Sequence, residues 1–260
     1  MKFLLTACLA TALSWSAVGQ PPAKIDVSQF PATMVDDVVV PVPSEIFSVL
    51  DKLGSPNWQA QLRQDSSDQL GNRAHIALLL GATVAEGFIA VQAQNPEKVK
   101  EIGKNVLKYS EAIGVRDAVI QHSNSIIEAA DKRDWNRVRS ELDRAQQNVR
   151  QAMAELRDEQ LAQLVSLGGW LRGTEVLTAI VRDDYSKDGA DLLHQPKLVS
   201  YFEEQLKNMP PGFARDPVVK KIQTVLSKIT PLVSVDTISL ESVKEIHGMT
   251  AEIIVLIMKP

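Results

Sequence analysis

The pattern that most constrains the fold runs from Trp135 to Leu156, where apolar residues recur at alternating steps of three and four. Its members are Trp135, Val138, Leu142, Ala145, Val149, Ala152 and Leu156. Such spacing places one apolar stripe on an α-helix, and Asp134, just before it, is a typical N-cap residue. The segment is therefore predicted to be a helix packed in an antiparallel bundle or along a coiled-coil seam.

The opposite face of this predicted helix is densely charged with both signs. It carries Arg137, Arg139, Glu141, Asp143, Arg144, Arg150, Glu155, Arg157 and Asp158. Mixed charges at this density are typical of a solvated helix surface. We therefore expect water, and no ligand or partner, on this face.

Helical spacing also extends over residues 44–54, 96–113, 115–130 and 239–258. Two further segments, 74–93 and 164–181, are more apolar and bear glycines, and both are expected to be buried central helices. A membrane span is disfavoured in the first because Glu86, near its middle, would be costly in lipid. Residues 183–191 are polar and are expected to form a surface loop. The predicted fold class is all-α, a multi-helix bundle.

The two halves of the helical region resemble each other when one is shifted by 99 residues. Lys98, Leu107, Lys108, Arg116, Asp117 and Val119 then match Lys197, Leu206, Lys207, Arg215, Asp216 and Val218. Six identities in thirty positions exceed the roughly two expected by chance, and an internal repeat is predicted on this ground. We expect a first helical half over 44–156 and a second over 157–260, packed as one or two domains.

The first nineteen residues predict a secretory signal peptide. Lys2 supplies the positive start, residues 3–15 form an apolar stretch, and residues 17–19 have the small side chains that a signal peptidase requires. The stretch is too short for a membrane anchor, which takes about 20 apolar residues. We therefore expect an exported protein, periplasmic or secreted, that begins at Gln20 and has no transmembrane span.

The same segment also contains a sequence that resembles a lipoprotein signal. Residues 5–8, Leu-Thr-Ala-Cys, look like a lipoprotein box, but only seven residues precede Cys8. Export signals run to about 15–30 residues, so lipidation of Cys8 is disfavoured. Cys8 is the single cysteine, and its removal would leave a mature chain without disulfides or thiolate ligands.

Residues 20–43 contain five prolines, which makes a long helix improbable there and favours an arm or linker. Val38–Val40 is the place where a short edge strand could form. Without residues 1–19 the formal net charge falls from −4 to −5, since one lysine and no acid are lost. Nucleic-acid binding is not expected, because it requires a basic face that can displace counterions from phosphates.

A search for reactive motifs identifies no candidate catalytic, cofactor-binding or metal-binding residues. Covalent-haem, zinc-protease, P-loop, nucleophile-elbow, EF-hand and di-iron signatures are all missing. His75, His122, His194 and His247 lack a second histidine or acid at the spacing of a helical metal site. The acidic pairs Asp36-Asp37 and Asp183-Asp184 lie in Pro-rich or loop segments, and Gly168-Gly169 follows a helix where a phosphate cradle would follow a strand.

These observations favour a non-enzymatic helical protein that acts through its surface, as a binding or scaffold module of the cell envelope. A protein partner or self-association is then expected. Two alternatives remain open. One is a helical carrier of a small apolar ligand or haem, with the two glycine-bearing helices lining a groove between the halves. The other is a hydrolase in which His122 or His194 meets a carboxylate in a cleft.

Overall fold

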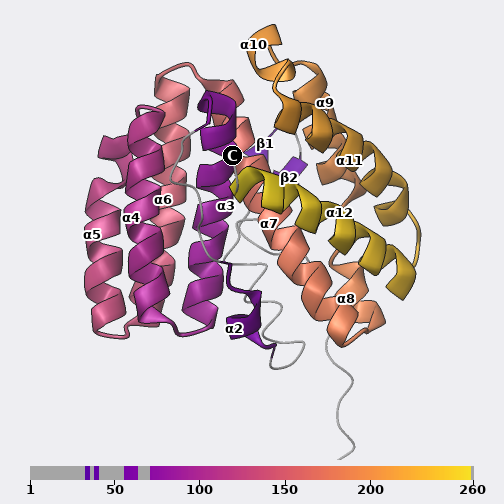
Figure 1. Ribbon diagram of the computed structural model, residues 1–260, viewed down its shortest axis with the longest axis horizontal. Helices are drawn as coiled ribbons and strands as arrows, with labels where there is room; N and C mark the ends of the chain where they lie inside the picture. The colour runs from indigo at the N-terminus through magenta and orange to yellow at the C-terminus, as the bar shows by residue number, and fades with distance from the viewer. Residues whose placement is uncertain (1–32, 36–37, 41–55, 64–70, 259–260) are drawn as a thin grey trace, which may run out of the picture.

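The computed structural model describes residues 33–35, 38–40, 56–63 and 71–258, which form a helical bundle with one small hairpin (Figure 1). The helices are α2 (Trp58–Gln61), α3 (Arg73–Gln92), α4 (Pro96–Ala112), α5 (Arg116–Asp131), α6 (Trp135–Glu155), α7 (Glu159–Asp183), α8 (Lys187–Asp191), α9 (Pro196–Lys207), α10 (Pro211–Ala214), α11 (Pro217–Val233) and α12 (Leu240–Met258). The all-α, multi-helix class predicted from the sequence is confirmed.

The hairpin pairs β1 (Thr33–Val35) with β2 (Val38–Val40) in antiparallel register, and β2 lies near α9. The sequence had suggested a strand over Val38–Val40 and had not suggested its partner strand. The predicted signal peptide, the Asp36-Asp37 pair and the helix expected over residues 44–54 lie outside the described residues.

Helices α3, α4, α5 and α6 form a four-helix group in which each packs on the next and α6 returns to α3 (Figure 1). Side-chain caps set their starts: Asn72, Asn95 and Asp134 each accept a hydrogen bond from the backbone N–H three residues on. Each bond satisfies a donor that the first helical turn leaves unpaired. Gly114 takes a φ of +85° in the turn after α4, a conformation that suits glycine.

The central contact of the molecule is between the two glycine-bearing helices, α3 and α7, which make the most extensive contact of any pair. Their backbones meet directly. A Cβ placed on Gly81 would lie 1.9 Å from the carbonyl oxygen of Val165, and one on Gly168 would lie 2.1 Å from that of Leu78. Only glycine fits at such a separation, so these two residues set how closely the helices approach.

The second group, α9, α11 and α12, lies on the other side of α7 (Figure 1). α12 packs along α7 and touches α3, where the ring Nε2 of His75 lies 2.7 Å from the carbonyl oxygen of Ile257. Trp170 of α7 packs on Phe202 of α9, with ring centroids 5.5 Å apart. The core is therefore continuous from one group to the other through α3 and α7.

Helix α6 departs from its prediction in two places. Leu156, expected to close the apolar stripe, lies just past the helix end and is 57% exposed, while Met153 is buried in its place. Glu141, expected on the solvated face, is 9% exposed because its carboxylate bonds His122 of α5. Of the other members, Val138, Leu142, Ala145 and Val149 are buried as expected, while Trp135 and Ala152 are partly buried and pack against the core.

The surface loop expected over residues 183–191 is only partly a loop. Residues 187–191 form α8, with Ser186 as its N-cap accepting from the N–H of Gly189 at 3.1 Å. Gly189 and Ala190 are buried, since their small side chains allow this short helix to lie against α7. The polar composition of the segment gave no indication that these two small residues would be buried.

Two described helices, α3 and α7, are long and apolar enough to cross a membrane by length and composition. In the structure, the apolar stretch of α3 is wholly buried inside the protein, and that of α7 almost wholly. The central helices of a folded core share this apolar composition with membrane spans.

Candidate functional site

Four charged side chains meet where α3 and α7 diverge below their glycine contact: Glu86 of α3, Arg172 and Glu175 of α7, and Arg63, just after α2. The side chains of Glu86 and Arg172 are 2% exposed and that of Glu175 is 5% exposed. Arg63 is 30% exposed and forms the outer end of the group. We call these four residues the charge cluster.

Arg172 is the centre of the charge cluster. Its Nε donates to Oε2 of Glu86 at 2.8 Å, and its Nη1 donates to Oε2 of Glu175 at 2.8 Å. Its Nη2 donates to the backbone carbonyl of Gln61. Because a buried guanidinium without partners would be very costly, these three acceptors are what allow Arg172 to lie in the core.

Arg63 completes the charge cluster from the outside. Its backbone N–H donates to Oε1 of Glu86 at 2.6 Å, while its guanidinium pairs with Oε1 of Glu175. All four carboxylate oxygens of the two glutamates thus have a donor, and two positive and two negative charges balance. A general base needs a carboxylate oxygen that can reach substrate, whereas each oxygen here is already bonded to an arginine residue and both carboxylates are buried.

His247 of α12 lies next to the charge cluster. Its Nδ1 is 3.2 Å from the backbone carbonyl oxygen of Glu175 and 3.3 Å from Oγ1 of Thr178. Burial lowers the pKa of His247 below its ordinary value, and the nearby charge of Arg182 lowers it further. The imidazole is therefore neutral at pH 7 and joins α12 to α7 by hydrogen bonds.

His122 meets a carboxylate, as the hydrolase alternative requires, but both of its ring nitrogens are occupied. Nδ1 lies 2.7 Å from Oε2 of Glu141, and Nε2 lies 2.7 Å from the amide nitrogen of Asn148. With the amide donating, the tautomer assigned to His122 carries its proton on Nδ1. This leaves no ring nitrogen to take a proton from a nucleophile, so the pair joins α5 to α6.

The free energy of unfolding is expected to depend on pH through Glu141. The hydrogen bond from His122 is the main cause that lowers the pKa of Glu141 below its ordinary value of 4.5. The stabilisation is therefore present above about pH 4.5 and is lost as the pH falls through the folded-state value. In urea unfolding at pH values from 7 to 3, Glu141→Gln is expected to lose less stability with acid than the unmodified chain. Parallel curves for the two proteins would contradict this.

The other sequence candidates are not brought together. His75 bonds the carbonyl of Ile257, and His194 lies in the turn between α8 and α9. In the described part of the chain, no three His, Cys, Asp or Glu residues are grouped so as to hold a metal ion. Asp183 pairs with Arg182 at 2.8 Å at the end of α7.

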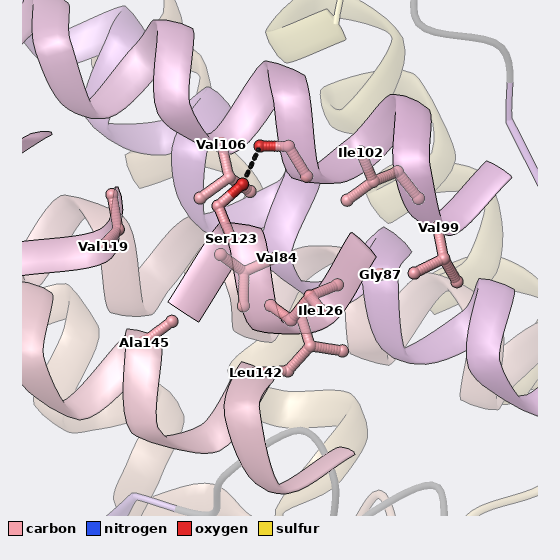
Figure 2. Close-up of a pocket in the computed structure, with 11 residues that line it drawn as sticks. Val84, Gly87, Val99, Ile102, Val106, Val119, Ser123, Ile126, Leu142 and Ala145 are labelled. Carbon is pink, nitrogen blue, oxygen red and sulfur yellow. Dashed lines mark hydrogen bonds between the residues drawn. The ribbon is translucent and has the colours of Figure 1, made fainter. Parts of the chain in front are cut away.

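Two cavities bear on the carrier alternative. Inside the α3–α6 group, Val84, Gly87, Val106 and Leu142 help to line an apolar space that holds only about 10 Å³ (Figure 2). This is roughly the room of one water molecule, against about 300–1,000 Å³ in ligand pockets. Ser123 at its wall already donates to the carbonyl of Gly103 at 3.1 Å (Figure 2).

The second cavity is at the surface, between α2 and the end of α7, and measures about 300 Å³. Its wall is mixed: the polar residues Asn57, Gln61, Asp183, Asp184 and Ser186 lie beside the apolar residues Pro56, Ala60, Ile180 and Val181. The backbones of α3 and α7, the two glycine-bearing helices that the carrier alternative has lining a groove, touch at Gly81 and Gly168, which leaves no room for a ligand between them at that level.

Sequence reasoning missed the charge cluster, although one signal for it was present. Glu86, Arg172 and Glu175 are charged residues inside the two most apolar helices, where an unpaired charge could not be buried. Arg172 and Glu175 are also three residues apart, the spacing of neighbours on a helix face. That pattern predicts a pairing between the helices, but it does not identify Arg63.

Comparison with known proteins adds no family to this description. The chain matches no protein-family model, and no curated protein and no solved structure is similar to it. The function is therefore argued from the chain's own residues and geometry.

Proposed function

We propose that this chain is exported and acts without catalysis, as a binding or scaffold module of the cell envelope. The signal-like residues 1–19 support export to the periplasm or the medium. The mature chain would be mildly acidic, and its described helices carry mixed charges on their outer faces, which suits recognition of proteins better than of nucleic acid.

The observation that carries this proposal is that the buried members of the charge cluster are paired with one another, with Arg63 and with the carbonyl of Gln61. Glu86, Arg172 and Glu175 are the ionisable groups that a buried active site would use, and each is hydrogen-bonded within the protein. A preorganised core of this kind holds helices in fixed positions, and it presents their outer faces as a rigid surface. Rigid surfaces of this type suit binding and assembly.

The exposed apolar side chains give such a surface its contact points. Among the described residues these are Leu156, Tyr185, Val235, Val255 and Leu256, each at least 36% exposed. Val255 and Leu256 are adjacent on α12. Single exposed apolar residues are ordinary, and self-association or a protein partner would cover them only in part.

The internal duplication is part of the same proposal. α4 and α9 begin at Pro96 and Pro196, and α5 and α11 begin at Arg116 and Pro217. α5 packs on α4, and α11 packs on α9. These starts are offset by 100 and 101 residues, close to the shift of 99 residues at which the identities occur, and so they support a repeat. Sequences of relatives would decide it, because a true repeat keeps matches at this shift while a chance likeness loses them.

Native mass spectrometry tests the proposal. The protein is expressed with its own N-terminus, recovered from the exported fraction and sprayed under native and denaturing conditions. We expect a chain that begins at Gln20, without added mass beyond self-association or a bound protein. A small-molecule or metal mass lost on denaturation would favour the carrier or hydrolase alternative. A lipid mass on Cys8 would replace the soluble exported form by a lipoprotein.

A further inference from the structure

Residues 57–63 contact the three buried members of the charge cluster, Glu86, Arg172 and Glu175, through three groups that any arginine-bearing peptide could offer. The carbonyl of Gln61 accepts from Arg172, the N–H of Arg63 donates to Glu86, and the guanidinium of Arg63 pairs with Glu175. We call Glu86, Arg172 and Glu175 together the recess. The recess thus bonds a main-chain carbonyl, a main-chain amide two residues later and the side chain of that same residue. Recognition of main-chain groups together with one anchoring side chain is typical of peptide-binding sites.

The rest of this segment also packs in the manner of a docked peptide. α2 has four residues, is capped by Asn57 and packs on α3. Trp58 is 8% exposed and belongs to the core cluster, which gives the segment an apolar anchor five residues before its arginine. One buried aromatic anchor and one arginine are the kinds of residue that carry most of the affinity in protein interfaces.

Charge selects the occupant of the recess. Without Arg63, the remaining charges of Glu86, Arg172 and Glu175 sum to −1, which favours a cation. Oε1 of Glu175 accepts from Nε of Arg63 at 3.1 Å and also pairs with its Nη2. Two donor nitrogens held side by side in one plane are available from a guanidinium, whereas lysine has a single ammonium nitrogen.

The exposure of the four side chains shows from which side an occupant enters. Those of Glu86, Arg172 and Glu175 are at most 5% exposed, whereas that of Arg63 is 30% exposed. An incoming arginine would therefore reach the same carboxylates from solvent once Arg63 leaves.

We propose that the recess formed by Glu86, Arg172 and Glu175 is a binding site for an arginine-bearing peptide segment of a partner protein, and that residues 57–63 occupy it as an internal competitor. The inference rests on the proposed function for the existence of a natural partner. The site itself is tested with the chain's own sequence, so that the two can fail separately.

The test measures binding of a labelled peptide with the sequence of residues 56–63, acetylated and amidated, to the chain 20–260 by fluorescence anisotropy. Arg63→Ala is expected to bind it about tenfold or more tightly than the unmodified chain, whose own segment competes at an effective concentration of about millimolar. A peptide with citrulline, the uncharged isostere of arginine, is expected to bind about tenfold or more weakly. Arg63→Ala combined with Glu175→Gln should lose this preference for arginine.

Three results would overturn the site. One is the lack of saturable binding to Arg63→Ala, another is equal binding of the arginine and citrulline peptides, and the third is arginine amide binding as tightly as the whole peptide. Should Arg63→Ala not fold, Arg63→Gln, which removes the charge and keeps a hydrogen-bonding amide, is measured with the same expectations. A small ligand found on the exported protein would count against the proposed function and not against these binding results.

Discussion

Gly81→Ala is expected to be the most destabilising single methyl addition in the described part of the chain. The new Cβ would lie 1.9 Å from the carbonyl oxygen of Val165, and 2.8 Å from the backbone nitrogen of Gly169. Both neighbours are backbone atoms, which cannot move aside as the end of a side chain can. The helices α3 and α7 must therefore separate along the most extensive contact of the molecule.

The size of the effect follows from this forced separation. Overpacking of a core usually costs about 1–3 kcal/mol, and here the loss of helix contact adds to it, so we expect about 4–5 kcal/mol or more. For a chain of this length this lowers Tm by roughly 10–20 °C. Gly168→Ala should behave alike, since its Cβ would lie 2.1 Å from the carbonyl oxygen of Leu78.

Two other glycines of α7 provide matched controls. A Cβ on Gly169 would come no closer than 3.4 Å to its nearest neighbour, and one on Gly173 would meet nothing within 4 Å. Gly173→Ala is expected to be neutral or to stabilise by about 0.5–1 kcal/mol, because alanine is the better helix former. Thermal unfolding of the four glycine-to-alanine variants, at Gly81, Gly168, Gly169 and Gly173, gives the order of their Tm values. Equal changes in Tm for Gly81→Ala and Gly173→Ala would contradict the close approach of the two helices.

Much of the fold could be predicted from the sequence because the helix ends are marked locally. Asn72 and Asp134 cap the helices that follow them, and Pro96 opens α4, as their residue types predict. Burial was harder to predict. Glu141 lies on the polar face of α6, and only the position of His122 on the neighbouring helix determines that it is covered.

The candidate site could not be predicted in full, because its members are brought together by tertiary packing. Arg63 and Glu175 are far apart in the sequence, and no periodic pattern joins a residue that follows a four-residue helix to the middle of α7. The glycines gave a partial signal. Gly81 and Gly168 lie in the two glycine-bearing segments that were expected to be buried central helices, but the sequence does not show that each glycine would pack against the other helix or that room would remain beside them for charged groups.

Arg172→Met is expected to be the most costly removal of a charge in the described part of the chain. It takes the donors from Glu86, Glu175 and the carbonyl of Gln61 at once, and leaves two buried carboxylates with Arg63 as their only counter-charge. Removing one partner of a buried ion pair costs about 3–5 kcal/mol, since the other charge stays uncompensated in the core. Chemical denaturation at pH 7 measures the loss.

A charged pair at the surface gives the control for this substitution. Arg73 pairs with Asp158 at 2.8 Å, but its side chain is 55% exposed, so Arg73→Met should cost about 1 kcal/mol or less. If the two substitutions cost the same, then the charge cluster is not held by Arg172 in the way its bonds indicate.

Neutral replacement of the three buried members of the cluster separates the cost of an unpaired buried charge from the loss of packing. Arg172→Met combined with Glu86→Gln and Glu175→Gln removes the buried charges, leaves the partly exposed Arg63 as the one charged member, and keeps the side chains similar in size. We expect this triple variant to recover more than half of the stability that Arg172→Met alone loses, because buried ion pairs are often replaced by neutral groups at little cost. Such a recovery would mean that the cluster contributes little net stability, and that its charges serve to fix where residues 57–63 dock. A triple variant less stable than Arg172→Met would instead make the hydrogen bonds of the carboxylates to Arg63 the main support of the core.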